Sequence, residues 1–192
     1  MITEPLVVTL LVTKAFDSLN IPYFIGGSLA TAAHGISRAT MDVDLIADIH
    51  VEQASQLVDI LGTDFYADAD MIRDAIQRQS SFNVIHLQTM FKVDVFVRKS
   101  RPFDQAQFQR RVLYTLVEEP VETAYIATPE DNILAKLEWY RLGGEVSDRH
   151  WQDIINVIKI QGERLDLPYL RRWASELGVT DILEKAIRAA QE

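Results

Sequence analysis

Two aspartates stand two positions apart inside an otherwise apolar stretch, "MDVDLIAD" at residues 41–48. This alternation predicts a β-strand. Side chains at positions i and i+2 of a strand point to the same face, about 6.6 Å apart. We therefore expect Asp42 and Asp44 to share one face while Val43 and Leu45 face the core. Two carboxylates this close repel each other unless a positive charge lies between them, and a hard divalent cation such as Mg²⁺ prefers oxygen ligands.

A second apolar stretch, "FKVDVFV" at residues 91–97, offers a third carboxylate, Asp94. A carboxylate in the middle of a strand is costly if it is buried without a partner. If this strand lies beside residues 42–47, Asp94 joins the first two acids, and three carboxylates can hold two metal ions roughly 3.5–4 Å apart. Taken alone, Asp94 is also consistent with an ion pair to Lys92 or Arg98.

A Gly–Gly–Ser sequence precedes the aspartates. Gly26 and Gly27 follow a short apolar strand and open the Ala-rich stretch "SLATAAHG", which predicts a helix that ends at Gly35. Glycines allow a tight turn and a close approach of the backbone to a ligand. Ser28 stands at the helix N-terminus, where backbone N–H groups favour an anion. Each feature alone is commonly a plain turn or a strand edge, whereas the ordered set predicts a nucleoside triphosphate site.

Helical and strand periodicities along the rest of the chain predict an α+β fold with a mixed or antiparallel sheet. Thr128 and Pro129 form an N-cap and first helical position, and Ser147 forms another N-cap. We expect a domain over residues 1–127 and a C-terminal helical region over 128–192. The other predicted helices cover residues 5–19, 51–62, 68–80, 168–177 and 180–190, and the other strands cover 81–88, 111–118 and 121–127.

Composition narrows the classes of function. The chain has 192 residues, no cysteine and 48% hydrophobic residues, which predicts a globular cytoplasmic protein without disulfides or thiolate metal sites. No segment approaches the roughly 20 apolar residues of a membrane span, and we expect no secretion signal. A net charge of −9 disfavours broad contact with nucleic acid. The best candidate for a local basic patch is "RKSRP" with Arg110 and Arg111, although a solvated face is the favoured interpretation.

The order G-G-S, T-x-D-x-D and strand Asp resembles the nucleotidyltransferase superfamily of the DNA polymerase beta type. The resemblance implies that the sheet is of the nucleotidyltransferase type. It implies that Mg²⁺ or Mn²⁺ is held by Asp42, Asp44 and Asp94, with Asp94 as the third ligand and general base. It also implies that the triphosphate is contacted by Gly26, Gly27, Ser28 and Thr40.

The C-terminal stretch "ILAKLEWYRLGG…SDRHWQDI" is similar to the helical region of the AbiEii-like group of bacterial nucleotidyltransferase toxins. This resemblance implies that Lys136 and Asp153 help to complete the nucleotide site. Alternatively, Lys136 is a solvated lysine and Asp153 a first-turn acid favoured by the helix dipole. We expect the aromatic residues of this region and the two histidines without metal-ligand spacing to be structural: Trp139, Tyr140, Trp151, His34 and His86.

Together the motifs predict a metal-dependent nucleotidyltransferase that moves a nucleoside monophosphate from an NTP to a hydroxyl. The acceptor is a tRNA, a protein or a small molecule, and a cognate antitoxin or toxin is a further predicted partner. The alternative is a catalytically inactive binding or regulatory protein, such as an antitoxin-like partner, on the same fold.

Overall fold

The computed structural model describes residues 4–36 and 42–191, which form two compact units. One unit comprises residues 4–26 and 42–126, and the other comprises residues 27–36 and 127–191. The predicted domain boundary between residues 127 and 128 stays a prediction. The structure adds that the short helix beginning at Gly27 belongs to the unit of C-terminal helices.

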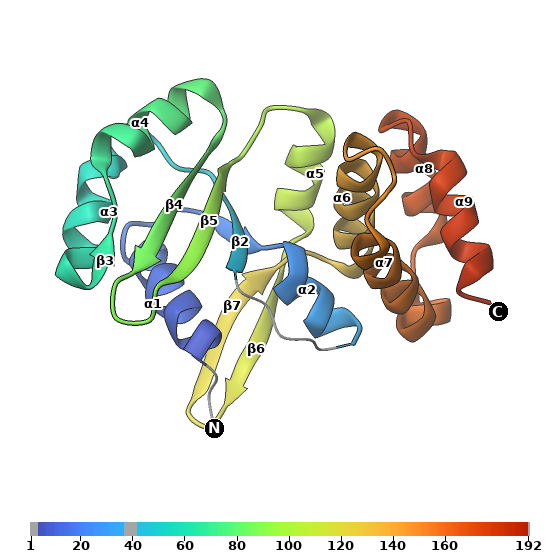
Figure 1. Cartoon of the computed structure of the whole chain (residues 1–192), viewed down its shortest axis with the longest axis horizontal. Helices are drawn as coiled ribbons and strands as arrows, with labels where there is room; N and C mark the ends of the chain where they lie inside the picture. Colours follow the sequence, from blue (N-terminus) through green and yellow to red (C-terminus); the bar gives the residue numbers. More distant parts are fainter. Residues whose placement is uncertain (1–3, 37–41, 192) are drawn as a thin grey trace. The chain divides into compact units, whose positions relative to one another are not determined.

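The first unit is built on a seven-stranded sheet with the order β3-β4-β5-β2-β1-β7-β6 (Figure 1). Strand β2 pairs in parallel with β5 and antiparallel with β1, so the sheet is mixed and the predicted α+β class is confirmed. The strands are β1 (Tyr23–Ile25), β2 (Asp42–Ala47), β3 (Phe65–Tyr66), β4 (Ser81–His86), β5 (Phe91–Val97), β6 (Val112–Glu118) and β7 (Val121–Ile126).

The helices of this unit are α1 (Glu4–Ser18), α3 (Gln53–Leu61), α4 (Ala69–Arg78) and α5 (Pro102–Arg110), with a 3₁₀ turn at Gly62–Asp64. The first three match predicted helices. Helix α5 and the two-residue strand β3 were not predicted. Pro102 occupies the first turn of α5, where its missing N–H costs nothing.

Strands β2 and β5 alternate between buried and half-buried side chains, as the sequence pattern predicts. Val43, Leu45, Val93 and Val95 are at most 1% exposed. Helix α1 contacts β2, β5 and β7 and contributes fully buried side chains such as Phe16 to the core. The opposite face of β2 and β5 is half-buried, and it carries the charged side chains of both strands.

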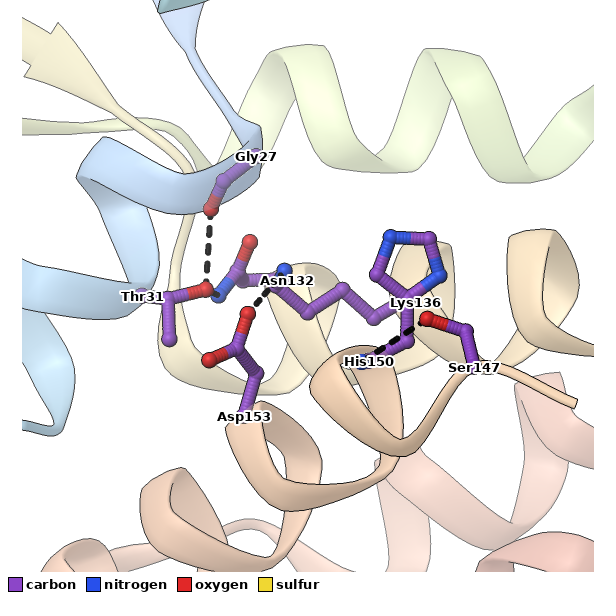
Figure 2. Close-up of polar contacts among 7 residues, drawn as sticks. All are labelled: Gly27, Thr31, Asn132, Lys136, Ser147, His150 and Asp153. Atoms are coloured by element: carbon purple, nitrogen blue, oxygen red, sulfur yellow. Dashed lines mark hydrogen bonds and ion pairs between the residues drawn. The ribbon is translucent and has the colours of Figure 1, made fainter. Parts of the chain in front are cut away.

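The second unit consists, within the described residues, of helices: α2 (Gly27–His34), α6 (Pro129–Leu142), α7 (Asp148–Gln161), α8 (Leu167–Glu176) and α9 (Thr180–Ala189), with a 3₁₀ turn at Gly162–Arg164. Both predicted N-caps are confirmed. The Thr128 hydroxyl accepts from the Asp131 N–H at 3.2 Å, and the Ser147 hydroxyl accepts from the His150 N–H at 3.3 Å (Figure 2).

The aromatic side chains of α6 and α7 follow the prediction only in part. Tyr140 is 9% exposed and stacks on Trp151 with ring centroids 5.6 Å apart. Trp139 was expected in the core, and this prediction is wrong because its side chain is 56% exposed. Its neighbour Tyr140 points into the helical core instead, and adjacent positions on a helix cannot share one face. In the part of the chain that the structure describes, no helix combines the length and apolar character needed to cross a membrane.

Candidate active site

The acidic face of the sheet is set by the parallel register of β2 and β5. Asp44 lies opposite Asp94, and Asp42 lies opposite Lys92. Paired residues on neighbouring strands project from the same face of a sheet, and so do residues two positions apart. The register therefore brings the carboxylates of Asp42, Asp44 and Asp94 to one half-buried face, together with the ammonium group of Lys92.

Both carboxylate oxygens of Asp94 have partners within the sheet. Oδ2 lies 2.6 Å from Lys92 Nζ, and Oδ1 accepts a hydrogen bond of 2.8 Å from Asn83 Nδ2 on β4. The ion pair between Asp94 and Lys92, one of the two pairings left open by the sequence, is thus present. The other is not formed, because Arg98 pairs with Asp48 at 3.0 Å.

A divalent cation fits this face in some respects and not in others. Carboxylate oxygens are suitable ligands for Mg²⁺, and the three acids share a face. Among the described side chains, however, no group of three or more acids, histidines or cysteines is arranged to hold an ion. The two oxygens of Asp94 meet Lys92 and Asn83, so a cation that bound the oxygen paired with Lys92 would compete with that ammonium group.

The neighbouring acids stabilise the charged form of Lys92. Its pKa is raised above the ordinary lysine value, first by the hydrogen bond to Asp94 and further by the negative charges of Asp94, Asp42 and Asp44. The lysine is thus held in its charged form on the acidic face. Sequence reasoning named Lys92 only as one possible partner of Asp94 and missed Asn83.

Gly26 directly follows β1, which pairs with the acidic strand β2. Its N–H donates to the carbonyl of Asp44 at 2.9 Å. A Cβ added at this position would lie 2.9 Å from Ile46 Cδ1, so the glycine permits the close approach of the two strands. This confirms the tight turn expected from the sequence, while a contact of Gly26 with nucleotide stays a prediction.

The second unit contains the beginning of α2. Gly27 is its first residue and has a φ of 53°, a left-handed conformation that favours glycine. Ser28 follows it in the first turn and is half-buried. The phosphate contact expected for Ser28 is untested, and Thr40 lies outside the described residues.

Lys136 on α6 and Asp153 on α7 form a buried ion pair in the second unit, with Nζ 2.9 Å from Oδ2 (Figure 2). Each side chain is only 8% exposed. The alternative of a solvated Lys136 is therefore wrong, and so is the alternative that Asp153 is a first-turn acid, because it lies beyond the first turn of α7. The two residues that the family resemblance paired are brought together by the packing of these helices.

A chain of hydrogen bonds extends the polar cluster from α6 to α2. Asn132 Nδ2 donates to Thr31 Oγ1 at 2.9 Å, and Thr31 Oγ1 donates to the carbonyl of Gly27 at 2.9 Å (Figure 2). Asn132 and Thr31 are almost fully buried. Sequence reasoning did not include them, although Asn132 lies four positions before Lys136 and so shares its helix face.

Both histidines singled out in the sequence have structural partners. His34 Nε2 lies 2.7 Å from the carbonyl of Ala127, and the His34 carbonyl accepts from Gln161 at 2.6 Å. Burial lowers the pKa of His34, opposed by its hydrogen bond to Ala127, so the neutral ring is favoured. His86 Nδ1 lies 2.9 Å from Thr89 Oγ1.

The basic segment after β5 is neutralised within the first unit. Arg101 pairs with Asp104 at 2.6 Å, and the guanidinium of Arg111 lies over the rings of Phe108 and Tyr125, 5.1 and 4.9 Å from their centroids. These contacts engage Arg101 and Arg111 within the protein, and the expectation about a nucleic-acid patch stays a prediction.

Several solved structures align with nearly the whole chain. An antigenic nucleotidyltransferase-like protein from Paracoccidioides brasiliensis aligns with a TM-score of 0.57 and 21% identity, over 95% of this chain and 91% of that one. The solution structure of the antibiotic-resistance factor ANT(2″)-Ia aligns with a TM-score of 0.55 and 12% identity, over 95% and 99%. The fold is that of the nucleotidyltransferases.

A crystal structure of ANT(2″)-Ia in complex with adenylyl-2″-tobramycin gives a TM-score of 0.54 at 13% identity, over 99% of this chain and 100% of that one. No protein-family model and no curated protein sequence matches the chain. Identities this low show the fold alone, and the AbiEii-like subgroup stays a prediction.

Proposed function

We propose that this protein is a nucleotidyltransferase that moves a nucleoside monophosphate from an NTP to a hydroxyl acceptor. The observation that carries the proposal is the parallel register of β2 and β5, which gives Asp42, Asp44 and Asp94 a common face on a nucleotidyltransferase fold. Acids that share a half-buried strand face do nothing for the core, whereas phosphoryl transfer requires such a set.

In the proposed reaction, the acceptor oxygen forms a bond to the α-phosphorus, the bond from that phosphorus to the bridging oxygen breaks, and pyrophosphate leaves. Asp94, once released from Lys92, accepts the hydroxyl proton. Asp42, Asp44 and Asp94 would hold Mg²⁺ or Mn²⁺, which when bound would neutralise negative charge on the phosphates. Gly26, Gly27, Ser28 and Thr40 contact the triphosphate.

Lys136 and Asp153 are proposed to bind nucleotide, with the Lys136 ammonium as a donor to phosphate oxygens. Support comes from their burial, because a buried ion pair is often no more stable than apolar side chains of similar volume. A charge that does little for stability is a candidate for function. Asn132 and Thr31, bonded to each other, complete the polar surroundings.

One of the structures with a similar fold suggests which class of acceptor to test first. One neighbour was solved with an adenylylated aminoglycoside, so a small molecule with free hydroxyls is the first acceptor to test. A tRNA end and a protein hydroxyl are the other proposed acceptors. We further propose a cytoplasmic location and a cognate antitoxin or toxin as a protein partner, both from the sequence alone.

The test is transfer of label from each of the four α-³²P-labelled NTPs to aminoglycosides, tRNA and lysate proteins. Asp42→Asn should reduce transfer by roughly a hundredfold or more, comparable with loss of a preorganised electrostatic contribution. The matched control is Asp59→Asn, which removes the same charge from an exposed position on α3. Absence of transfer from all four NTPs, or equal rates for the two variants, would contradict the proposal.

The second candidate is a non-catalytic binding protein on the same fold. It is favoured by one observation, the engagement of both Asp94 oxygens with Lys92 and Asn83. Such a protein would bind NTPs without releasing pyrophosphate. A thermal shift with NTP and Mg²⁺, combined with no transfer of label to any acceptor, would favour this candidate over the enzyme.

A further inference from the structure

Lys92 occupies a position on the acidic face that the proposed reaction does not use. It lies opposite Asp42 in the β2–β5 register and two residues before Asp94, so its side chain lies on the same face of the sheet as the three carboxylates. Its Nζ is 2.6 Å from Asp94 Oδ2, and its side chain is 42% exposed, against 15% for Asp94. The lysine therefore covers the carboxylate from the solvent side.

We propose that Lys92 is a positioning residue that competes with a divalent cation for Asp94. The inference rests on the proposed function, because it assumes that the three acids form its metal site. In the metal-free protein the ammonium group neutralises the acids and keeps Asp94 oriented together with Asn83. A divalent cation recruits Asp94 only after Lys92 has left its oxygen.

The competition follows from the contacts of the Asp94 carboxylate. Oδ1 accepts from the Asn83 amide and Oδ2 binds Lys92, so each oxygen already has a donor. A cation bound to Asp42 and Asp44 would also lie near the Lys92 ammonium. Repulsion between charges of +2 and +1 about 5 Å apart in a water-like medium corresponds to on the order of tenfold in affinity.

The experiment measures Mn²⁺ binding to the NTP-free protein by the loss of the free-ion electron paramagnetic resonance signal. Lys92→Met removes the charge at similar length and should bind Mn²⁺ about tenfold more tightly than wild type. Lys92→Arg keeps the charge and should stay close to wild type. The matched control is Lys99→Met, which removes a lysine charge from an exposed position just beyond β5 and should change little.

Adding Asp94→Asn to Lys92→Met separates the role of Asp94 from that of net charge. The double variant should lose most of the gained affinity, because the released carboxylate is then missing. Equal Mn²⁺ affinity of Lys92→Met and Lys99→Met would overturn the inference, as would absence of Mn²⁺ binding by every variant.

The Mn²⁺ affinities test the competition whether or not the protein transfers nucleotide. A protein that transfers no label but binds Mn²⁺ more tightly as Lys92→Met contradicts the proposed transfer reaction and supports the competition. A protein that transfers label but shows no effect of Lys92→Met on Mn²⁺ affinity supports the proposed transfer reaction and contradicts the competition.

Discussion

The ion pair between Lys136 and Asp153 gives the most direct test of how the second unit is built. Its side chains are 8% exposed, and Nζ lies 2.9 Å from Oδ2. Lys136→Met leaves the Asp153 carboxylate buried without its cation, which costs about 3–5 kcal/mol for a pair of this kind. Lys136→Met combined with Asp153→Leu removes both charges and should recover most of this loss, because the desolvation penalty also disappears.

The assay is urea unfolding followed by tryptophan fluorescence. All three tryptophans, Trp139, Trp151 and Trp173, lie in the second unit, so the signal reports on this unit. The control is Lys159→Met at an exposed position of α7, which should change the free energy of unfolding by no more than about 0.5 kcal/mol. From the wild type, the two single variants and the double variant, a coupling energy of at least about 3 kcal/mol is expected, because each single substitution leaves one buried charge unpaired and the double substitution leaves none.

Two results would refute this reasoning about Lys136. One is a Lys136→Met variant as stable as the Lys159→Met control. The other is a double variant whose loss equals the sum of its two single losses, since the side chains would then not interact. If the double variant is stable but no longer binds NTP, the pair serves nucleotide binding rather than folding.

Three further predictions concern single groups. Burial and the charge of Asp17 raise the pKa of Tyr23 from 10.0 to about 12, so its folded form stays neutral where the unfolded form ionises. Stability should fall as pH rises from 10 towards 12, and a pH series of urea unfolding should show a shallower fall for Tyr23→Phe. Burial lowers the pKa of His34, so stability should decline as pH falls below about 6.5, the ordinary pKa of histidine, and His34→Gln, which keeps a donor, should remove this decline in the tryptophan signal. Gly26→Ala should cost about 1–3 kcal/mol through overpacking against Ile46, and Ile46→Val in the same chain should restore part of it in thermal unfolding; no rescue would contradict the contact.

Most elements of the fold were predictable because their sequence periodicity is strong. The alternation in β2 and β5 and the capped starts of α6 and α7 specify these elements locally. Helix α5 was missed because it buries only Phe103, Gln107 and Phe108, which gives a weak helical pattern among charged residues. Strand β3 is too short to show a period and exists only through its pairing with β4.

The partner of Asp94 could have been decided from strand geometry alone. Lys92 and Arg98 both have the parity that puts them on the face of Asp94, but two residues along a strand span about 6.6 Å and four residues about 13 Å. Only Lys92 is therefore within reach, as the 2.6 Å ion pair shows. Asn83 was beyond prediction, because its place opposite Asp94 depends on the β4–β5 register.

Helix α6 shows why the polar cluster of the second unit escaped prediction. It buries four polar residues, Glu130, Asp131, Asn132 and Lys136, although such residues on a helix usually face water. The first two have evident structural tasks near the start of α8: Glu130 accepts from the Asp166 N–H at 3.1 Å, and Asp131 accepts from the Tyr169 hydroxyl at 2.6 Å.

Asn132 and Lys136 have no comparable task at a helix end. Asn132 binds Thr31 of α2 from the first turn of α6, and Lys136 binds Asp153 of α7 from the middle of α6, where apolar residues would pack at least as well. Burial of a lysine is costly and gives this packing no evident advantage. The packing of the second unit therefore gives little reason to bury Asn132 and Lys136. Nucleotide binding by this unit should be sought first at these two side chains.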